Sequence, residues 1–191
     1  MHLTKFMTWG RSSRRGKRKP KKVIFLDIDG VICTLRSHFA FAHPGGLMKD
    51  WDVTACQMLA QMCRKHNIKI VVSSTWRTHE DLSNYMCVYG LIDHVHPTDP
   101  VTKRFPPIKN KVTKNFRNRI RGFDVSEWLR RHPEVTDYCI IDDDRDFYKY
   151  QMRRLIHVTS NSDGLSAQNW MDMYEWFGRK RRKHGKVKVS R

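Results

Sequence analysis

Two carboxylates, Asp27 and Asp29, stand two residues apart directly after the apolar run 23–26. Side chains at this spacing share one face of an extended segment, so the two carboxyl groups can lie close together. Carboxylates this close repel one another unless a cation lies between them or one of them is protonated. Gly30 follows and permits a sharp backbone turn where a phosphate could approach. The pattern indicates a cation-binding carboxylate pair.

A second acidic cluster, Asp142 to Asp144, follows the apolar run 138–141. If both runs are strands of one parallel sheet, Asp142 and Asp143 can complete an all-oxygen site of the kind that magnesium prefers. The alternative is that these are loop acids that cap helix N-termini, and for Asp29 taken alone this alternative stays open.

The elements that must position these residues alternate between strands and helices. Four short apolar runs are predicted strands: Val23–Leu26, Ile68–Val72, Tyr138–Ile141 and Leu155–Val158. Helices are predicted to begin at Asp52, Thr78, Asp124 and Ser166, and His94–Phe116 is predicted to be a loop. Strands that are apolar on both faces predict an α/β fold, a three-layer, doubly wound (Rossmann-like) and mostly parallel sheet. Ligands of such sheets bind at the carboxyl ends of the strands.

Three segments resemble the motifs of the haloacid dehalogenase-like (HAD) phosphohydrolase superfamily. The segment 27–31 is similar to its D-x-D-G-[VT] motif, 71–73 to its second motif, and 139–143 to its fourth. The segments 73–77, 121–122 with 127–129, and 164–166 resemble a finer subgroup, seen in viral and bacterial genomes. That subgroup is associated with nucleic-acid repair, and the phosphatase halves of polynucleotide kinase-phosphatases are relatives. The intervals between the motifs are too short for a large cap domain.

The resemblance implies a reaction in which Asp27 attacks phosphorus and forms an aspartyl-phosphate. Asp29 would protonate the leaving oxygen and then deprotonate the attacking water. Mg²⁺ would be held by Asp27, the main-chain carbonyl of Asp29, and Asp143, with Asp142 behind them.

The resemblance also implies side chains that bind the phosphoryl oxygens. Ser73 is the expected hydroxyl, and Arg121 is the expected cation of the third motif. Other candidates for phosphate contacts are Ser74, Arg77, Lys114 and Arg119.

Positive charge is concentrated at the two ends of the chain. The net charge is +18, and the segments 1–22 and 179–191 carry 17 of the 37 basic residues and no acidic residue. We therefore predict a phosphatase domain over residues 23–178 between two basic tails. The segment 101–123 is also basic and contains no acidic residue. The tails could be solvated ends, but together with this segment they favour a nucleic-acid partner, DNA or RNA.

The sequence thus predicts a Mg²⁺-dependent phosphomonoesterase that acts on nucleic-acid ends, most simply a 3′-phosphatase of repair. One alternative is a nucleotidase for free mononucleotides, and another is a nucleic-acid-binding protein with a vestigial phosphatase site. Five cysteines without C-x-x-C spacing and the lack of an apolar run of membrane-spanning length predict a soluble, cytoplasmic protein. The segment 14–22 would also pass as a nuclear localisation signal in a eukaryotic host.

Overall fold

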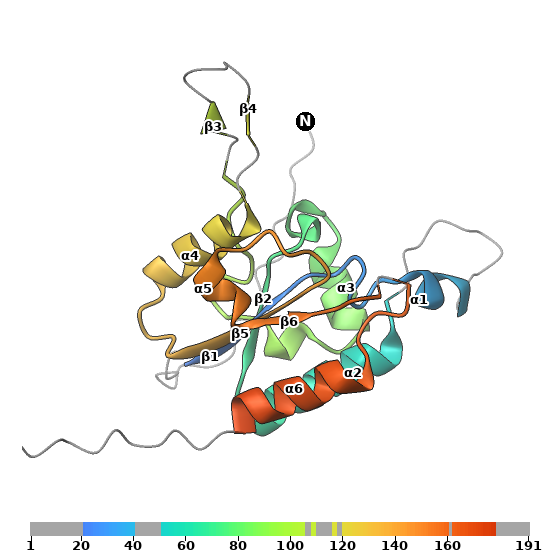
Figure 1. Ribbon diagram of the computed structural model, residues 1–191. Helices are drawn as coiled ribbons and strands as arrows, with labels where there is room; N and C mark the ends of the chain where they lie inside the picture. Colours follow the sequence, from blue (N-terminus) through green and yellow to red (C-terminus); the bar gives the residue numbers. More distant parts are fainter. Residues whose placement is uncertain are drawn as a thin grey trace, which may run out of the picture.

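A four-stranded parallel sheet forms the centre of the computed structural model (Figure 1). The structure describes residues 21–40, 51–105, 108–109, 116–117, 120–160 and 162–178. The strands lie in the order β2-β1-β5-β6. Their bounds are Lys22–Leu26 for β1, Lys69–Val72 for β2, Asp137–Asp142 for β5 and Leu155–His157 for β6. The predicted α/β fold with its parallel sheet is confirmed.

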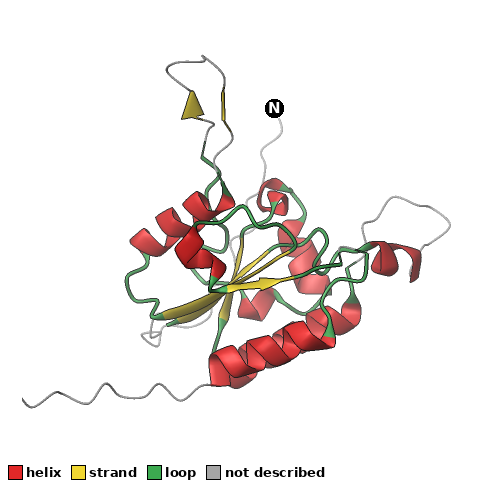
Figure 2. Cartoon of the chain, in the orientation of Figure 1, coloured by secondary structure: helices red, strands yellow, loops and turns green. Residues whose placement is uncertain are grey.

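The central strand β1 contributes to two hydrophobic cores, one on each face of the sheet. Successive side chains of a strand point to opposite faces. Ile24 and Leu26 pack in the larger core with side chains of the helices over residues 53–66 and 167–178, whereas Val23 and Phe25 pack against Trp128 of the helix over residues 121–131. Figure 2 shows helices on both sides of the sheet. A strand buried on both faces explains the uninterrupted apolar run in the sequence.

Helices cover both faces and connect the strands. Their bounds are Leu35–Ala40 for α1, Val53–His66 for α2, Leu82–Val88 for α3, Arg121–Arg131 for α4, Lys149–Met152 for α5 and Ala167–Gly178 for α6. The predicted start of α2 is confirmed, because the Asp52 side chain accepts a hydrogen bond from the Ala55 amide at 2.9 Å. Within the described residues, no helix is long and apolar enough to cross a membrane.

Three predicted boundaries were wrong. The helix predicted from Asp124 begins at Arg121, so Asp124 lies inside its first turn. The helix predicted from Thr78 begins at Leu82, because residues 75–78 form a 3₁₀ turn. Residues 35–40 form α1, although the sequence predicted no helix there. A helix of six residues is too short to show a hydrophobic period.

The segment predicted as a loop over 94–116 also contains regular pairing. Val95 and Val101 form parallel bridges with Ile70 and Val72, so this segment runs along the outer edge of β2. The Thr102 amide donates to the Val72 carbonyl at 2.9 Å. Further on, β3 (Ile108–Lys109) and β4 (Phe116–Arg117) form an antiparallel pair apart from the central sheet (Figure 1).

Gly122 allows α4 to approach the segment that follows β5. A Cβ atom at this position would lie 2.8 Å from the Tyr148 amide nitrogen and 2.9 Å from Phe147 Cα. We therefore expect Gly122→Ala to lower the free energy of unfolding by about 1–3 kcal/mol, because two backbone segments must separate. Urea denaturation measures the change. Gly178→Ala is the matched control, since nothing lies within 4 Å of a Cβ at that position. An equal effect of both substitutions would contradict the packing explanation.

Candidate active site

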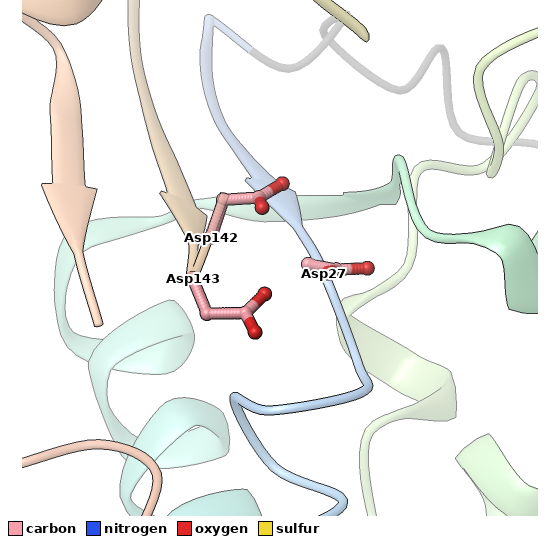
Figure 3. A group of neighbouring side chains, drawn as sticks. All are labelled: Asp27, Asp142 and Asp143. Carbon is pink, nitrogen blue, oxygen red and sulfur yellow. The ribbon is translucent and has the colours of Figure 1, made fainter. Parts of the chain in front are cut away.

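The carboxyl ends of the neighbouring strands β1 and β5 bring three carboxylates together. Leu26 pairs with Ile141, and the Asp27 amide donates to the Ile141 carbonyl at 2.9 Å. This register places Asp27, directly after β1, beside Asp142, the last residue of β5. One carboxylate oxygen from each of Asp27, Asp142 and Asp143 lies within 4.8 Å of the other two (Figure 3).

The environment of this acidic group opposes negative charge. Burial, together with the charge of Asp27, raises the pKa of Asp142 to about 8. The same two causes raise the pKa of Asp143, which is half-buried. Grouped carboxylates with raised pKa values gain stability when a cation lies between them. Three oxygen donors at this spacing fit a hard divalent cation such as Mg²⁺.

Arg121 supplies one positive charge at this site from the first residue of α4. Its Nη1 atom lies 2.8 Å from Asp27 Oδ2 and 2.5 Å from Asp142 Oδ2. Burial opposes the charged form of the guanidinium, but Asp27 and Asp142 outweigh burial and hold the pKa of Arg121 above its ordinary value. The Arg121 amide donates to Asp146 Oδ2 at 3.0 Å, which fixes the start of the helix. The guanidinium is therefore held permanently charged beside Asp27.

The Asp29 carboxylate accepts a hydrogen bond from an indole in the 3₁₀ turn that follows β2. Trp76 Nε1 donates to Asp29 Oδ1 at 2.9 Å. The Trp76 ring is buried, stacks on His79 and makes edge contacts with Trp51 and Tyr85. The aromatic cluster fixes the indole, and the indole in turn orients the Asp29 carboxylate. The sequence reading did not assign Trp76 a role, because its contact with Asp29 spans 47 residues.

The two serines after β2 differ in their surroundings. The Ser73 amide donates to the Leu26 carbonyl at 2.9 Å, which places Ser73 beside the end of β1. Its Oγ is buried and has no hydrogen-bond partner within the described part of the chain. By contrast, Ser74 Oγ accepts from the Trp76 amide at 3.3 Å and caps the 3₁₀ turn. An unsatisfied buried hydroxyl is unfavourable, and a phosphoryl oxygen would satisfy that of Ser73.

The structure turns Arg77 toward the protein interior. Its Nη2 atom lies 2.9 Å from Asp124 Oδ2, and its Nη1 atom donates to the Ser73 carbonyl at 2.8 Å and to Thr102 Oγ1 at 2.7 Å. The guanidinium is almost fully buried. These contacts favour a role in positioning Ser73 over the substrate contact expected from the sequence. Lys114 and Arg119, the other basic candidates, lie outside the described residues.

A cavity of about 620 Å³ opens over this site. Its lining includes the charged side chains of Asp27, Asp29, Asp143, Asp144 and Arg121. It also includes residues of the segment that follows Gly30, namely Cys33, Thr34, Leu35 and His38.

A parallel sheet with acidic strand ends and a paired arginine is the arrangement of a HAD-type hydrolase. The family model of the HAD domain in Swiss Army Knife RNA repair proteins matches residues 23–170. The chain therefore belongs to this family, and it is a HAD-type phosphatase. The expected resemblance to repair-associated HAD phosphatases is confirmed. Neither the curated proteins nor the solved structures gave a match.

Proposed function

We propose that the protein is a Mg²⁺-dependent phosphomonoesterase that acts through an aspartyl-phosphate on nucleic-acid ends. The observation that carries this proposal is the grouping of Asp27, Asp142 and Asp143 with Arg121 at the ends of two adjacent strands. In such a group, a nucleophile, a cation site and a fixed positive charge lie close enough together to contact the same phosphate.

Two steps follow from these positions. A carboxylate oxygen of Asp27 attacks phosphorus and displaces the ester oxygen, which takes a proton from Asp29. Water then attacks the phosphorus of the aspartyl-phosphate while Asp29 accepts a proton from the water. This attack breaks the bond to Asp27, which releases phosphate and restores the Asp27 carboxylate. The Arg121 guanidinium balances the charge on the phosphoryl oxygens, and the Ser73 hydroxyl donates a hydrogen bond to one of them.

The acidic group would hold magnesium through Asp27 and Asp143, with the main-chain carbonyl of Asp29 as a third ligand. Asp142, which pairs with Arg121 at 2.5 Å, would lie behind these ligands. A cation bound there would reduce the repulsion between the anionic Asp27 carboxylate and an anionic phosphate.

Removal of divalent cations is expected to abolish phosphate release. Dialysis against EDTA should remove the activity, and Mg²⁺ should restore it. Asp143→Asn should raise the Mg²⁺ concentration needed for half-maximal activity at least about tenfold, because one anionic ligand is lost. The exposed Asp172→Asn is the control and should need the same Mg²⁺ as the unchanged protein. Full activity in EDTA would exclude a metal-dependent reaction.

The contact between Trp76 and Asp29 predicts a dependence on the leaving group. In Trp76→Phe the indole N–H is lost, so Asp29 is less well placed to protonate a poor leaving group. We expect kcat/KM to fall about tenfold for an alkyl phosphate and about twofold or less for 4-nitrophenyl phosphate. Trp51→Phe is the matched control, because it removes the N–H of a neighbouring indole. The ring centroid of Trp51 lies 5.5 Å from that of Trp76. An equal loss with both substrates would indicate a packing defect only.

The nucleic-acid substrate is supported by the family, whose description names RNA repair, and by the basic ends of the sequence. We expect faster Mg²⁺-dependent phosphate release from a 3′-phosphorylated oligonucleotide than from a mononucleotide. The preference should weaken with salt, because salt competes with basic side chains for the phosphate backbone. Equal or faster turnover of the mononucleotide would favour a nucleotidase. Release from neither substrate would leave a binding protein with a vestigial site.

A further inference from the structure

Helix α1 lines the cavity with Leu35 and His38 and is connected by hydrogen bonds and an ion pair to other segments. Thr34 and Ser37 exchange hydrogen bonds at its start, from the Thr34 amide to Ser37 Oγ at 2.9 Å and from the Ser37 amide to Thr34 Oγ1 at 3.1 Å. Both side chains are buried. The Arg36 amide donates to the Ser162 carbonyl at 3.0 Å, and Arg36 Nη2 lies 2.6 Å from Asp52 Oδ2. Two local hydrogen bonds therefore stabilise the start of this six-residue helix, which alone would be unstable in water, and two contacts of Arg36 connect it to other segments.

The segment before α6 packs closely against the residues that precede α1. Gly164 has a φ of +73°, and a Cβ there would lie 2.5 Å from the Val31 carbonyl oxygen and 2.7 Å from Thr34 Cγ2. The Leu165 amide donates to the Val31 carbonyl at 3.3 Å. Glycine is thus required for this close approach. The orientation of α1 is set before any substrate binds.

Helix α1 presents large side chains to solvent. Leu35 is 57% exposed and Phe39 is 73% exposed, and the His38 side chain is also exposed. The His38 and Phe39 rings meet edge to face, with centroids 5.6 Å apart. Single exposed apolar residues are common. What distinguishes Leu35 and His38 is that they line the same cavity as Asp27 and Asp29.

The charges in the cavity restrict what can lie against its α1 residues. Asp29, Asp143 and Asp144 line the cavity and disfavour a second phosphate near them. Helix α1 contributes an aliphatic side chain and an imidazole ring to the same lining, which suit an uncharged planar group. In a phosphomonoester held at Asp27, the group that extends toward α1 is the leaving group.

We propose that α1 forms a subsite for the terminal nucleoside, with the base packed against Leu35 and His38 while its phosphate lies at Asp27. This inference rests on the proposed phosphatase function and specifies the recognised part of the substrate. The subsite recognises the uncharged base and sugar next to the reacting phosphate.

The test compares a nucleoside 3′-monophosphate with glycerol 2-phosphate, a secondary alkyl phosphate without a base. In the variant Leu35→Ala/His38→Ala, kcat/KM for the nucleotide should fall about tenfold through KM, the size expected for loss of one base contact. Turnover of glycerol 2-phosphate should stay within about twofold. Val88→Ala on α3 is the control, because Val88 is similarly exposed at 71% and does not line the cavity.

Two results would overturn the inference and leave the phosphatase intact. One is an equal loss on both substrates, and the other is no loss on the nucleotide. Thermal melting verifies that the variants fold, and His38→Ala alone, at an exposed position, provides the same comparison. If the unchanged protein released phosphate from neither ester, the proposed function itself would fail, and the inference with it.

Discussion

Asp27→Asn is expected to reduce phosphate release by about 10⁴-fold or more, because the amide cannot form the aspartyl-phosphate. The substitution removes a charge without changing the shape of the side chain. Asp27 also raises the pKa values of Asp142 and Asp143, so its negative charge opposes theirs. Asp27→Asn removes one ion pair of Arg121, but Asp142 remains as its charged partner at 2.5 Å, so the variant should remain folded.

The measurement combines turnover with trapping of the intermediate. Acid quenching after mixing with a ³²P-labelled ester should leave label on the unchanged protein and none on the Asp27→Asn variant. Asp163→Asn, an exposed carboxylate near Ser160, should keep both label and turnover. Full activity in Asp27→Asn would exclude Asp27 as the nucleophile.

Arg121→Met is expected to have the second largest effect, and it should act on both activity and stability. The substitution keeps an extended side chain but leaves Asp27 and Asp142 without their charged partner. Loss of one partner from a buried ion pair costs about 3–5 kcal/mol of unfolding free energy. Activity should fall about 10³-fold, since the charge beside the phosphoryl oxygens is also lost.

Magnesium separates the two consequences of this substitution. Because a bound cation also neutralises Asp27, Mg²⁺ should raise the melting temperature of Arg121→Met more than that of the unchanged protein. Turnover should remain low, since the cation does not replace the guanidinium at the phosphoryl oxygens. Arg121→Lys should recover part of both losses. A fully active Arg121→Met would transfer the third-motif role to Lys114 or Arg119.

The sequence determined the strands and the acidic clusters, because both are local patterns. An apolar run buried on two faces is visible in four or five residues, and 23–26 and 138–141 were correctly predicted as strands. Asp27 and Asp142 follow these runs directly. Once the strands are parallel neighbours, their ends must meet, so the grouping of the acids followed from the chain itself.

Only the tertiary structure decided which distant side chains meet this acidic group. Arg121 was the expected third-motif cation, with Lys114 and Arg119 as alternatives, but only the tertiary structure shows that the start of α4 brings Arg121 to Asp27 across 94 positions of chain. The inward turn of Arg77 depends on Asp124, which had been predicted as a helix cap.

The same reason applies to Trp76 and to α1. Neither the contact from Trp76 to Asp29 nor the packing of Gly164 under Thr34 is encoded by spacing, since each joins segments brought together by the sheet. Local patterns specify elements and their ends. Contacts between elements, which set the geometry of the phosphate and leaving-group sites, arise only when the whole domain packs.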